Sequence, residues 1–332
     1  MKLTKKILAL ALAVLMMASL CTGLASCNKD DGTFTIGICQ LVTHPALDAA
    51  TEGFKQAVID ELGADKVTFD VQNANNDIPM CKTITDNFST TGVDLIMANA
   101  TPALQAAVKS TKTIPILGTS VTEYGVALEI ENFSGTVGGN VSGTSDLAPL
   151  DQQAKMITDL VPNATRVGLL YCAAEPNSVY QVNVIKAELA KKNITCTEYK
   201  FNDTNDVSLV AAQAAQENDA LYVPTDNTAA SCAAAIYNAM GENKKPLIAG
   251  EEGICSGCGI ATLSIDYYDL GYATGKMAAK ILKGDAKVSE MAIEYAPQFT
   301  KKYNDQICRA LGVDTAALEA AGYVAIEGTK AN

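Results

Sequence analysis

The stretch Thr35-Ile36-Gly37-Ile38-Cys39-Gln40-Leu41-Val42-Thr43-His44-Pro45-Ala46-Leu47-Asp48 decides the fold. Its apolar beginning, residues 34–38, is β-branched and too short for a helix, which predicts a buried parallel strand. Pro45 then opens a helical pattern, because proline suits the first helical position, where its missing N–H would have no partner. The strand therefore delivers Gln40 and His44 to a helix N-terminus, at the sheet edge where open α/β folds bind ligands.

The first 26 residues predict a signal peptide. Three lysines precede an apolar run over residues 7–20, which is too short and too soon interrupted for a membrane span. Leu24-Ala25-Ser26-Cys27 resembles the bacterial lipobox, whose cysteine is acylated and becomes the first mature residue. We expect an extracytoplasmic protein that a lipid on Cys27 anchors to the bacterial cell membrane, with residues 27–32 as a tether. An ordinary cleaved signal peptide is the alternative.

The mature chain is acidic and nearly free of arginine. Removing the three lysines of the leader leaves 22 basic residues against 37 acidic ones, a net charge of −15. Nucleic acid is a poor partner for such a surface. Arg166 and Arg309 are the two arginines of the sequence, which argues against a phosphate or dicarboxylate specialist, because such proteins usually use arginine forks.

Eight cysteines follow Cys27, and the sequence cannot decide how they pair. Cys255 and Cys258 form the one motif-like pair, for which a local disulfide, an exposed dithiol and a packing role all remain open. We expect no metal site, because a second CxxC is lacking and His44 is the sole histidine. No cofactor motif is present either.

Strands and helices alternate along the chain. The strand patterns cover residues 34–38, 67–71, 94–98, 114–117, 166–171, 195–199, 220–223, 247–249, 262–265 and 293–295. The helical patterns cover residues 45–62, 78–88, 101–110, 150–160, 178–191, 207–215, 228–240 and 267–283. This alternation predicts an α/β protein with two doubly wound parallel-sheet lobes and a hinge. The glycine-rich residues 135–145 are the predicted first crossover between the lobes.

Polar side chains follow most of the predicted strands. They are Gln40 with His44; Thr101; Thr119 and Ser120; Glu175, Asn177 and Ser178; Thr225, Asp226 and Asn227; Glu251; and Asp266. Any one of them suits a helix cap equally well. Seven such clusters at one edge of two sheets predict a ligand cleft, where helix N-termini would attract a carboxylate.

Several of these segments together resemble one family. They are residues 37–40 and 44–48, Ala100-Thr101-Pro102-Ala103, residues 139–146, Glu175-Pro176-Asn177-Ser178, Pro224-Thr225-Asp226-Asn227 and residues 266–271. In this order they resemble the ABC-transporter substrate-binding proteins of the tryptophan/aromatic amino-acid type, which have the type I periplasmic-binding-protein fold. Thr122-Glu123-Tyr124, where relatives usually have Thr-Asp-Pro, and the Cys255–Cys258 segment depart from the family pattern near the expected cleft.

The resemblance implies an organisation and a function. Lobe 1 would comprise residues 33–145 plus 264–288 and lobe 2 residues 146–263 plus 289–332, with crossings near 143–148, 261–266 and 286–292. By lobe closure the protein would deliver a small zwitterionic ligand to an ABC permease and its ATPase, and the resemblance implies an aromatic amino acid. The chain has no tryptophan, so its pocket would be less aromatic than the family suggests. The protein would not be an enzyme. The alternatives are an enzyme on a similar scaffold that uses Asp226 and Asp266, and a ligand sensor without a transporter.

A zwitterionic amino acid needs different partners at its two charged ends. We predict that Thr101, Thr119, Ser120 and the helix N-terminus at Pro102 bind the carboxylate. Asp226, with Asp266 as the second choice, is predicted to bind the ammonium group. The residues predicted to orient the ligand are Gln40, Asn177, Ser178 and Asn227.

Overall fold

A computed structural model describes residues 32–296 and 298–329 of the chain. The predicted signal peptide, the lipobox and Cys27 lie outside these residues. The chain divides into two units, residues 1–33 and Phe34–Asn332, and every element described below belongs to the second.

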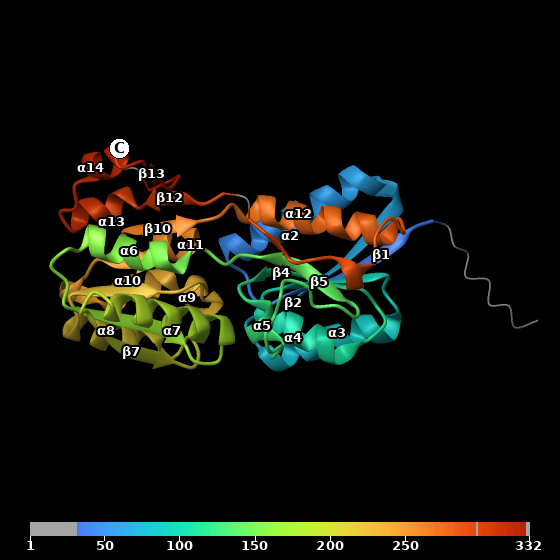
Figure 1. The fold of residues 1–332 in the computed structure, drawn as a ribbon, viewed down its shortest axis with the longest axis horizontal. Helices are drawn as coiled ribbons and strands as arrows, with labels where there is room; N and C mark the ends of the chain where they lie inside the picture. The colour runs from blue at the N-terminus through green and yellow to red at the C-terminus, as the bar shows by residue number, and fades with distance from the viewer. Residues whose placement is uncertain (1–31, 297, 330–332) are drawn as a thin grey trace, which may run out of the picture. The chain divides into compact units, whose positions relative to one another are not determined.

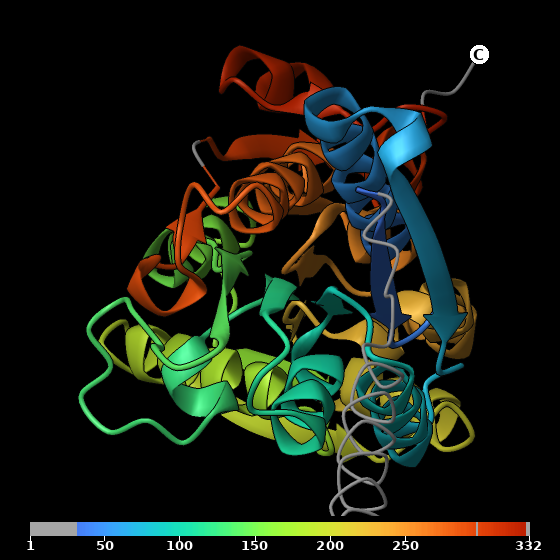
Figure 2. The ribbon, with the colours of Figure 1, turned by 90° about the vertical axis from the view of Figure 1, so that its right-hand side faces the viewer.

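The first sheet consists of parallel strands in the order β11-β5-β4-β3-β1-β2. Their bounds are β1 (Phe34–Gln40), β2 (Val67–Asn73), β3 (Leu95–Asn99), β4 (Ile116–Val121), β5 (Val141–Ser145) and β11 (Glu294–Tyr295). The long helices α2 (Pro45–Leu62) and α12 (Tyr267–Leu282) lie side by side on one face (Figures 1 and 2). The other face is covered by α3 (Ile78–Thr91), α4 (Thr101–Ser110) and α5 (Tyr124–Ala127).

The second sheet has the order β13-β12-β10-β9-β8-β6-β7 and is parallel except where β10 pairs with β12. Its strands are β6 (Arg166–Cys172), β7 (Thr195–Phe201), β8 (Ala220–Val223), β9 (Leu247–Ala249), β10 (Ala261–Ser264), β12 (Thr300–Tyr303) and β13 (Val324–Ala325). One core packs beneath α6 (Leu150–Leu160), α7 (Pro176–Ala190), α13 (Asp305–Ala310) and α14 (Thr315–Ala320). The core on the other face packs beneath α8 (Val207–Glu217), α9 (Asn227–Ser231), α10 (Ala233–Ala239) and α11 (Glu252–Cys258). Short 3-10 turns cover Ala64–Lys66, Gly241–Asn243 and Val288–Glu290.

This architecture confirms the predicted α/β class with two doubly wound, parallel-dominated sheets. Most apolar runs that predicted strands form the buried central strands of both sheets, because a strand covered by helices on both faces needs apolar side chains on both sides, whereas the edge strands β2 and β7 are largely exposed or half-buried.

The prediction of a crossover over residues 135–145 is wrong, because Val141–Ser145 forms β5 inside the first sheet and the chain crosses only after it, over residues 146–149. The Ser-Gly-Thr sequence of β5 lacks the apolar run that marks the other strands. Gly143 has φ +147°, and a Cβ atom there would lie 2.1 Å from the carbonyl oxygen of Gly118 on β4. The close approach of two backbones therefore explains the small residues at this position.

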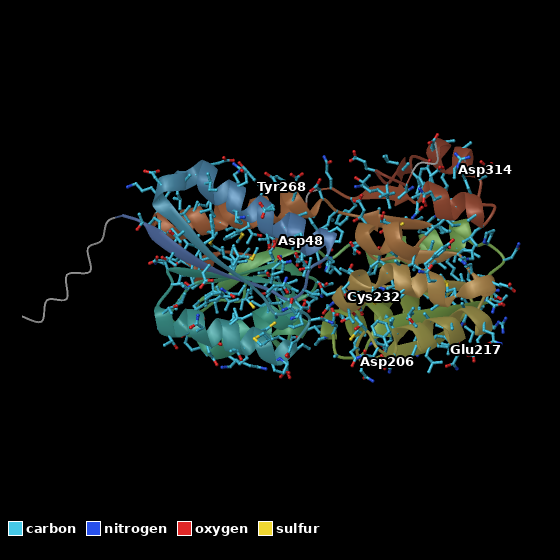
Figure 3. The ribbon with its side chains drawn as sticks, turned by 180° about the vertical axis from the view of Figure 1, so that it is seen from behind. Asp48, Asp206, Glu217, Cys232, Tyr268 and Asp314 are labelled. Carbon is cyan, nitrogen blue, oxygen red and sulfur yellow. The ribbon has the colours of Figure 1, made fainter. Side chains whose placement is uncertain are left out.

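The predicted helix over residues 228–240 is also divided. Cys232 adopts φ −133° and ψ 24° and separates α9 from α10 (Figure 3). Helix α11 and the elements after residue 296 were not predicted, because each is short and has little hydrophobic periodicity.

The chain passes between the two sheets in three short segments. Residues 146–149 join β5 to α6, residues 265–266 join β10 to α12, and residues 296–299 join β11 to β12. Strand β10 lies in the second sheet and helix α12 packs on the first. The second passage therefore connects the carboxyl end of β10 directly to the N-terminus of α12.

Candidate functional site

The structure places the predicted site residues at the carboxyl ends of strands in both sheets. All are buried except Asp266, which is exposed. The group at the first sheet, which we call the first side, consists of Gln40, His44, Thr101, Thr119 and Ser120. The group at the second sheet, which we call the second side, consists of Glu175, Asn177, Ser178, Thr225, Asp226, Asn227 and Glu251. Asp266 lies in the second passage and belongs to neither group.

Among the described residues, two side-chain hydrogen bonds join the lobe of the first sheet to the second side. Nε2 of His44 lies 3.4 Å from Oδ1 of Asn227. Nδ2 of Asn76, in the loop after β2, donates to the hydroxyl of Thr228 at 3.1 Å. Burial lowers the pKa of His44, so its imidazole is neutral at physiological pH and contributes no charge to the site.

The carboxylates of the second side bind backbone and side-chain groups of the second side itself. Glu175 accepts from the backbone N–H groups of Asn227, at 3.0 Å, and Thr228, at 2.8 Å, and also from both of their side chains. Asp226 accepts from the backbone N–H groups of Cys172, at 2.7 Å, and Ala229, at 2.8 Å.

Glu251 has the same arrangement at the start of α11. One of its oxygens accepts from the N–H of Gly253 at 2.7 Å and the other from the N–H of Ile254. Burial raises the pKa of Glu251 to about 7 and, together with the nearby Glu175, raises that of Asp226 to about 8. Both carboxyl groups are thus held away from water, and neither forms an ion pair with a described residue.

On the first side, the side chains of Gln40 and Thr119 bind within the first lobe. Oε1 of Gln40 accepts from the Thr51 hydroxyl at 2.6 Å, and its Nε2 donates to Asp48 at 2.6 Å. The Thr119 hydroxyl accepts from that of Thr274 on α12 at 3.1 Å, which places it beneath the helix. These two side chains hold the edge of the sheet in place.

Ser120 differs from them. The register of β4 against β5 shifts between Gly118 and Val121, and Ser120 has φ +53°, a left-handed conformation that is costly for any residue but glycine. Its hydroxyl is buried and has no hydrogen-bond partner. The bulge thus places an unpaired hydroxyl at the end of the strand. Strained backbone of this kind is often found at binding sites.

Asp146 is a site residue that the sequence did not predict. It follows β5 directly, so recognising β5 as a strand would have placed Asp146 among the polar residues at strand ends. Its Oδ2 accepts from the hydroxyl of Tyr267 at 3.0 Å, whereas its Oδ1 is buried without a partner. Burial raises the pKa of Asp146 to about 6.

Unpartnered buried polar atoms gather at these strand ends. Native proteins pair nearly all buried polar atoms, so each exception needs an explanation. Among the described residues the unpartnered side-chain atoms are His44 Nδ1, Asn99 Oδ1, Ser120 Oγ, Asp146 Oδ1, Asn177 Oδ1 and Thr262 Oγ1. Three of these residues are predicted site residues and a fourth is Asp146, so the unpartnered atoms concentrate where the sequence predicts the ligand cleft.

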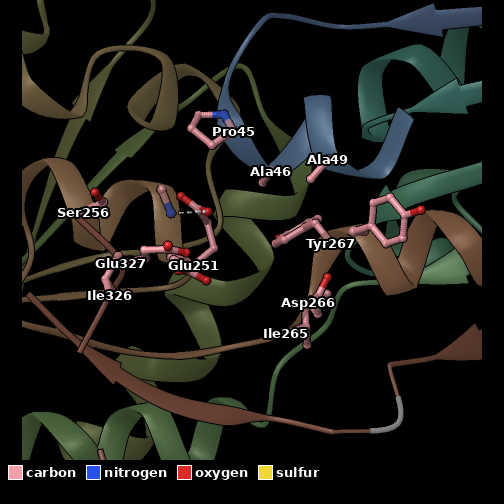
Figure 4. A pocket seen from close by; sticks show the side chains of 13 residues that line it. Pro45, Ala46, Ala49, Glu251, Ser256, Ile265, Asp266, Tyr267, Ile326 and Glu327 are labelled. Atoms are coloured by element: carbon pink, nitrogen blue, oxygen red, sulfur yellow. Dashed lines mark hydrogen bonds between the residues drawn. The ribbon is translucent and has the colours of Figure 1, made fainter. Parts of the chain in front are cut away.

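A pocket of about 330 Å³ opens beside this cluster (Figure 4). In this view the N-terminus of α11 lies on the left, Asp266 and Tyr267 of the second passage lie on the right, and the start of α2 lies above them. The lining residues are Pro45, Ala46, Ala49, Glu251, Glu252, Gly253, Ser256, Ile265, Asp266, Tyr267, Tyr268, Ile326 and Glu327. Since Tyr267 also binds Asp146, the pocket shares a wall with the buried cluster.

Cys255 and Cys258 are unbonded and buried in the core beneath α11. Burial raises the pKa of both thiols, which makes them unreactive, and the structure therefore favours the packing role left open by the sequence. In the described part of the chain, no three His, Cys, Asp or Glu side chains are grouped as a metal site would require. Nor does that part contain a helix long and apolar enough to cross a membrane.

Comparison with known proteins gives consistent results. Residues 35–320 match the family described as ABC transporter substrate binding protein. The chain is 34% identical to the tyrosine-binding protein of Clostridioides difficile over 97% of its own length and 96% of that protein.

Two solved structures are similar as well. In each case the match covers 89% of this chain and 100% of the other chain. An ABC domain in complex with L-Trp from Streptococcus pneumoniae is 32% identical with a TM-score of 0.83. A ligand-free, open substrate-binding protein with adhesive properties from Clostridium difficile is 36% identical with a TM-score of 0.67.

Proposed function

The chain belongs to the ABC transporter substrate-binding protein family, and from that premise we propose that it binds an aromatic amino acid between its two sheets and delivers it to an ABC importer. The family comprises substrate-binding proteins, which supports the predicted solute-binding role. The relatives that bind tyrosine and L-Trp support the ligand class. The observation that carries the proposal is the cluster of buried, unpartnered polar atoms at the strand ends of both sides.

The first side suits the carboxylate of the ligand. Helix α4 begins after Ala100, which has no side chain that could accept from the first N–H groups of the helix. Helix α2 likewise has no side-chain cap at His44. Uncapped helix N-termini carry free N–H groups and partial positive charge, and together with the Ser120 hydroxyl they form a carboxylate site without arginine.

We further propose that binding closes the two sides on each other about the passages 146–149, 265–266 and 296–299. The contacts of His44 with Asn227 and of Asn76 with Thr228 exist only while the two sides are close. The higher TM-score against the L-Trp complex than against the open, ligand-free protein supports a closed arrangement. A ligand that touches both sides would favour this state through those additional contacts.

Lipid anchoring at Cys27 completes the proposed function, because an importer receives its ligand at the outer face of the membrane. The diacylglycerol of a lipoprotein supplies two chains, enough for stable anchoring where one is marginal. Expressed in the native host, a Cys27→Ser variant should lose labelling by a fatty-acid analogue and be released from the membrane. Retention of both properties would contradict the anchor.

A thermal-shift screen of the common amino acids against refolded, ligand-stripped protein tests the ligand class. At about 100 times its dissociation constant, a ligand should stabilise the protein by about 2.7 kcal/mol. We expect the largest shifts with L-tyrosine and L-tryptophan. No shift with any amino acid would contradict the proposal.

A further inference from the structure

We propose that Asp146, in the first passage between the sheets, binds the ammonium group of the ligand. This inference rests on the proposed function, since it assigns a residue to one end of an amino acid. It replaces Asp226 and Asp266, which the sequence suggested for this role.

The hydrogen bonds of the buried carboxylates distinguish Asp146 from the others near the strand ends. Glu175, Asp226 and Glu251 each accept hydrogen bonds at both oxygens, mostly from backbone N–H groups of the second side. To bind an ammonium group, each would share or give up bonds that hold its own loop. Asp146 has one oxygen bonded to Tyr267, and the other, Oδ1, is buried without a hydrogen-bond partner of normal geometry in the described chain, although the Thr122 side chain lies near the carboxylate and lowers its pKa.

Asp266 is excluded by its position. It is exposed, and its carboxylate caps α12 by accepting from the N–H of Asp269 at 3.1 Å. A carboxylate in water gains little from a cation, because solvent screens the interaction.

No cation balances Asp146 within the described chain. None of the ion pairs there includes it, although only 4% of the residue is exposed. A buried carboxylate without a counter-charge is costly, and this cost is relieved when a cationic ligand binds. A sugar hydroxyl would leave the charge uncompensated, so the site selects an ammonium group.

A second unpartnered acceptor, on Asn177, is linked to Asp146 through a chain of contacts. Asn177 directs its Nδ2 at the carbonyl oxygen of Thr225, 3.0 Å away, and its Oδ1 has no partner. The Thr225 side chain in turn lies against the hydroxyl of Tyr267, which binds Asp146. An ammonium group has three N–H donors, and this chain of contacts offers two unpartnered oxygens for them.

The test compares ligands with and without the amino group on matched variants. L-Tyrosine and 3-(4-hydroxyphenyl)propionate, which lacks only the ammonium group, are titrated by calorimetry into refolded wild type and Asp146→Asn. Asp151→Asn, an exposed change on the neighbouring α6, is the control. We expect Asp146→Asn to weaken L-tyrosine about 100-fold, as for removing one member of a buried charge pair, and to leave the deamino analogue within about threefold.

Asp146→Asn should fold, because it removes a buried charge and keeps the shape of the side chain. Asp146→Ser provides a second neutral variant with the same expected preference. If wild type binds L-tyrosine and both variants bind it equally tightly, the role of Asp146 is refuted and the proposed function stands. The same holds if Asp226→Asn instead abolishes the preference for the amino group. If wild type binds neither L-tyrosine nor L-tryptophan, the proposed function fails and this inference fails with it.

Discussion

The two sides of the cleft differ in how their carboxylates are used. On the second side, Asp226 and Glu251 cap α9 and α11, and Glu175, which leaves its own helix α7 without a side-chain cap, binds the first two N–H groups of α9. On the first side, α2 and α4 begin without a side-chain cap. Capping satisfies the N–H groups of a helix internally, whereas an uncapped helix leaves them for a ligand.

Backbone strain follows the same division. Ala100 and Ser120, at the ends of β3 and β4, have φ +99° and +53°. The residues at the corresponding strand ends of the second side, Glu175, Asp226 and Glu251, have extended backbone. The comparison teaches that the second side is stabilised by its own carboxylates, while the first side stores strain and unpaired donors that a ligand carboxylate would use.

The largest effect is expected where the first sheet depends on close backbone approach. Gly143→Ala should lower the free energy of unfolding by about 4 kcal/mol, because a methyl group would overlap the backbone of Gly118 and φ +147° is strained for alanine. Gly138→Ala, at φ +82° with open space around it, is the control and should cost only about 1 kcal/mol. Equal costs in urea unfolding would show that the β4–β5 contact is not tight.

The second side should be most sensitive to Glu175. Glu175→Ala leaves the N–H groups of Asn227 and Thr228 buried without an acceptor and should lower the free energy of unfolding by about 3 kcal/mol. Chemical denaturation measures the change, with the exposed Glu242→Ala as control. If the two variants are equally stable, the carboxylates of the second side do not hold its loops.

Ser120→Gly should move stability and binding in opposite directions. Glycine relieves the left-handed strain and removes an unpaired hydroxyl, so the unliganded protein should gain about 1 kcal/mol. Affinity for L-tyrosine should fall about tenfold with the loss of one hydrogen bond to a charged group. Asn193→Gly, at φ +59° in an exposed turn, should raise stability without changing affinity. A Ser120→Gly protein with unchanged affinity would remove Ser120 from the site.

A smaller effect is expected from pH. Burial raises the pKa of Asp226 to about 8 and of Glu251 to about 7, so the folded state holds these protons more tightly than the unfolded state. The stability they contribute is present at low pH and is lost as pH rises through these values. The melting temperature of the ligand-free protein should therefore rise by at least about 2 °C between about pH 8.5 and 6.5.

Below about pH 6.5 the rise should become shallower, because the lowered pKa of buried His44 favours protonation of the unfolded chain. Asp226→Asn should flatten the rise above that pH. A melting temperature that falls steadily from pH 8.5 to 6.5 would contradict the buried state of these carboxyl groups.

The sequence predicted the fold from its apolar strands and predicted most strand-end residues from the polar positions that follow them. It missed β5, because a strand of small residues has no apolar run, and with β5 it missed Asp146. The sequence could not decide whether Asp146 or Asp226 is available to bind an ammonium group. That depends on which carboxylate oxygens already accept hydrogen bonds in the folded protein. Nor could the sequence foresee the bulge at Ser120, which depends on the pairing of β4 with β5.

The central claim is that a zwitterion binds with its carboxylate at the first side and its ammonium group near Asp146. Because the chain contains no tryptophan, fluorescence of bound L-tryptophan can be followed by energy transfer from the tyrosines of the protein. We predict a saturable signal that L-tyrosine displaces, while tryptamine, which lacks the carboxylate, and indole-3-propionate, which lacks the amino group, displace it at least about 100-fold less well. Displacement by either analogue as effectively as by L-tyrosine would contradict the account.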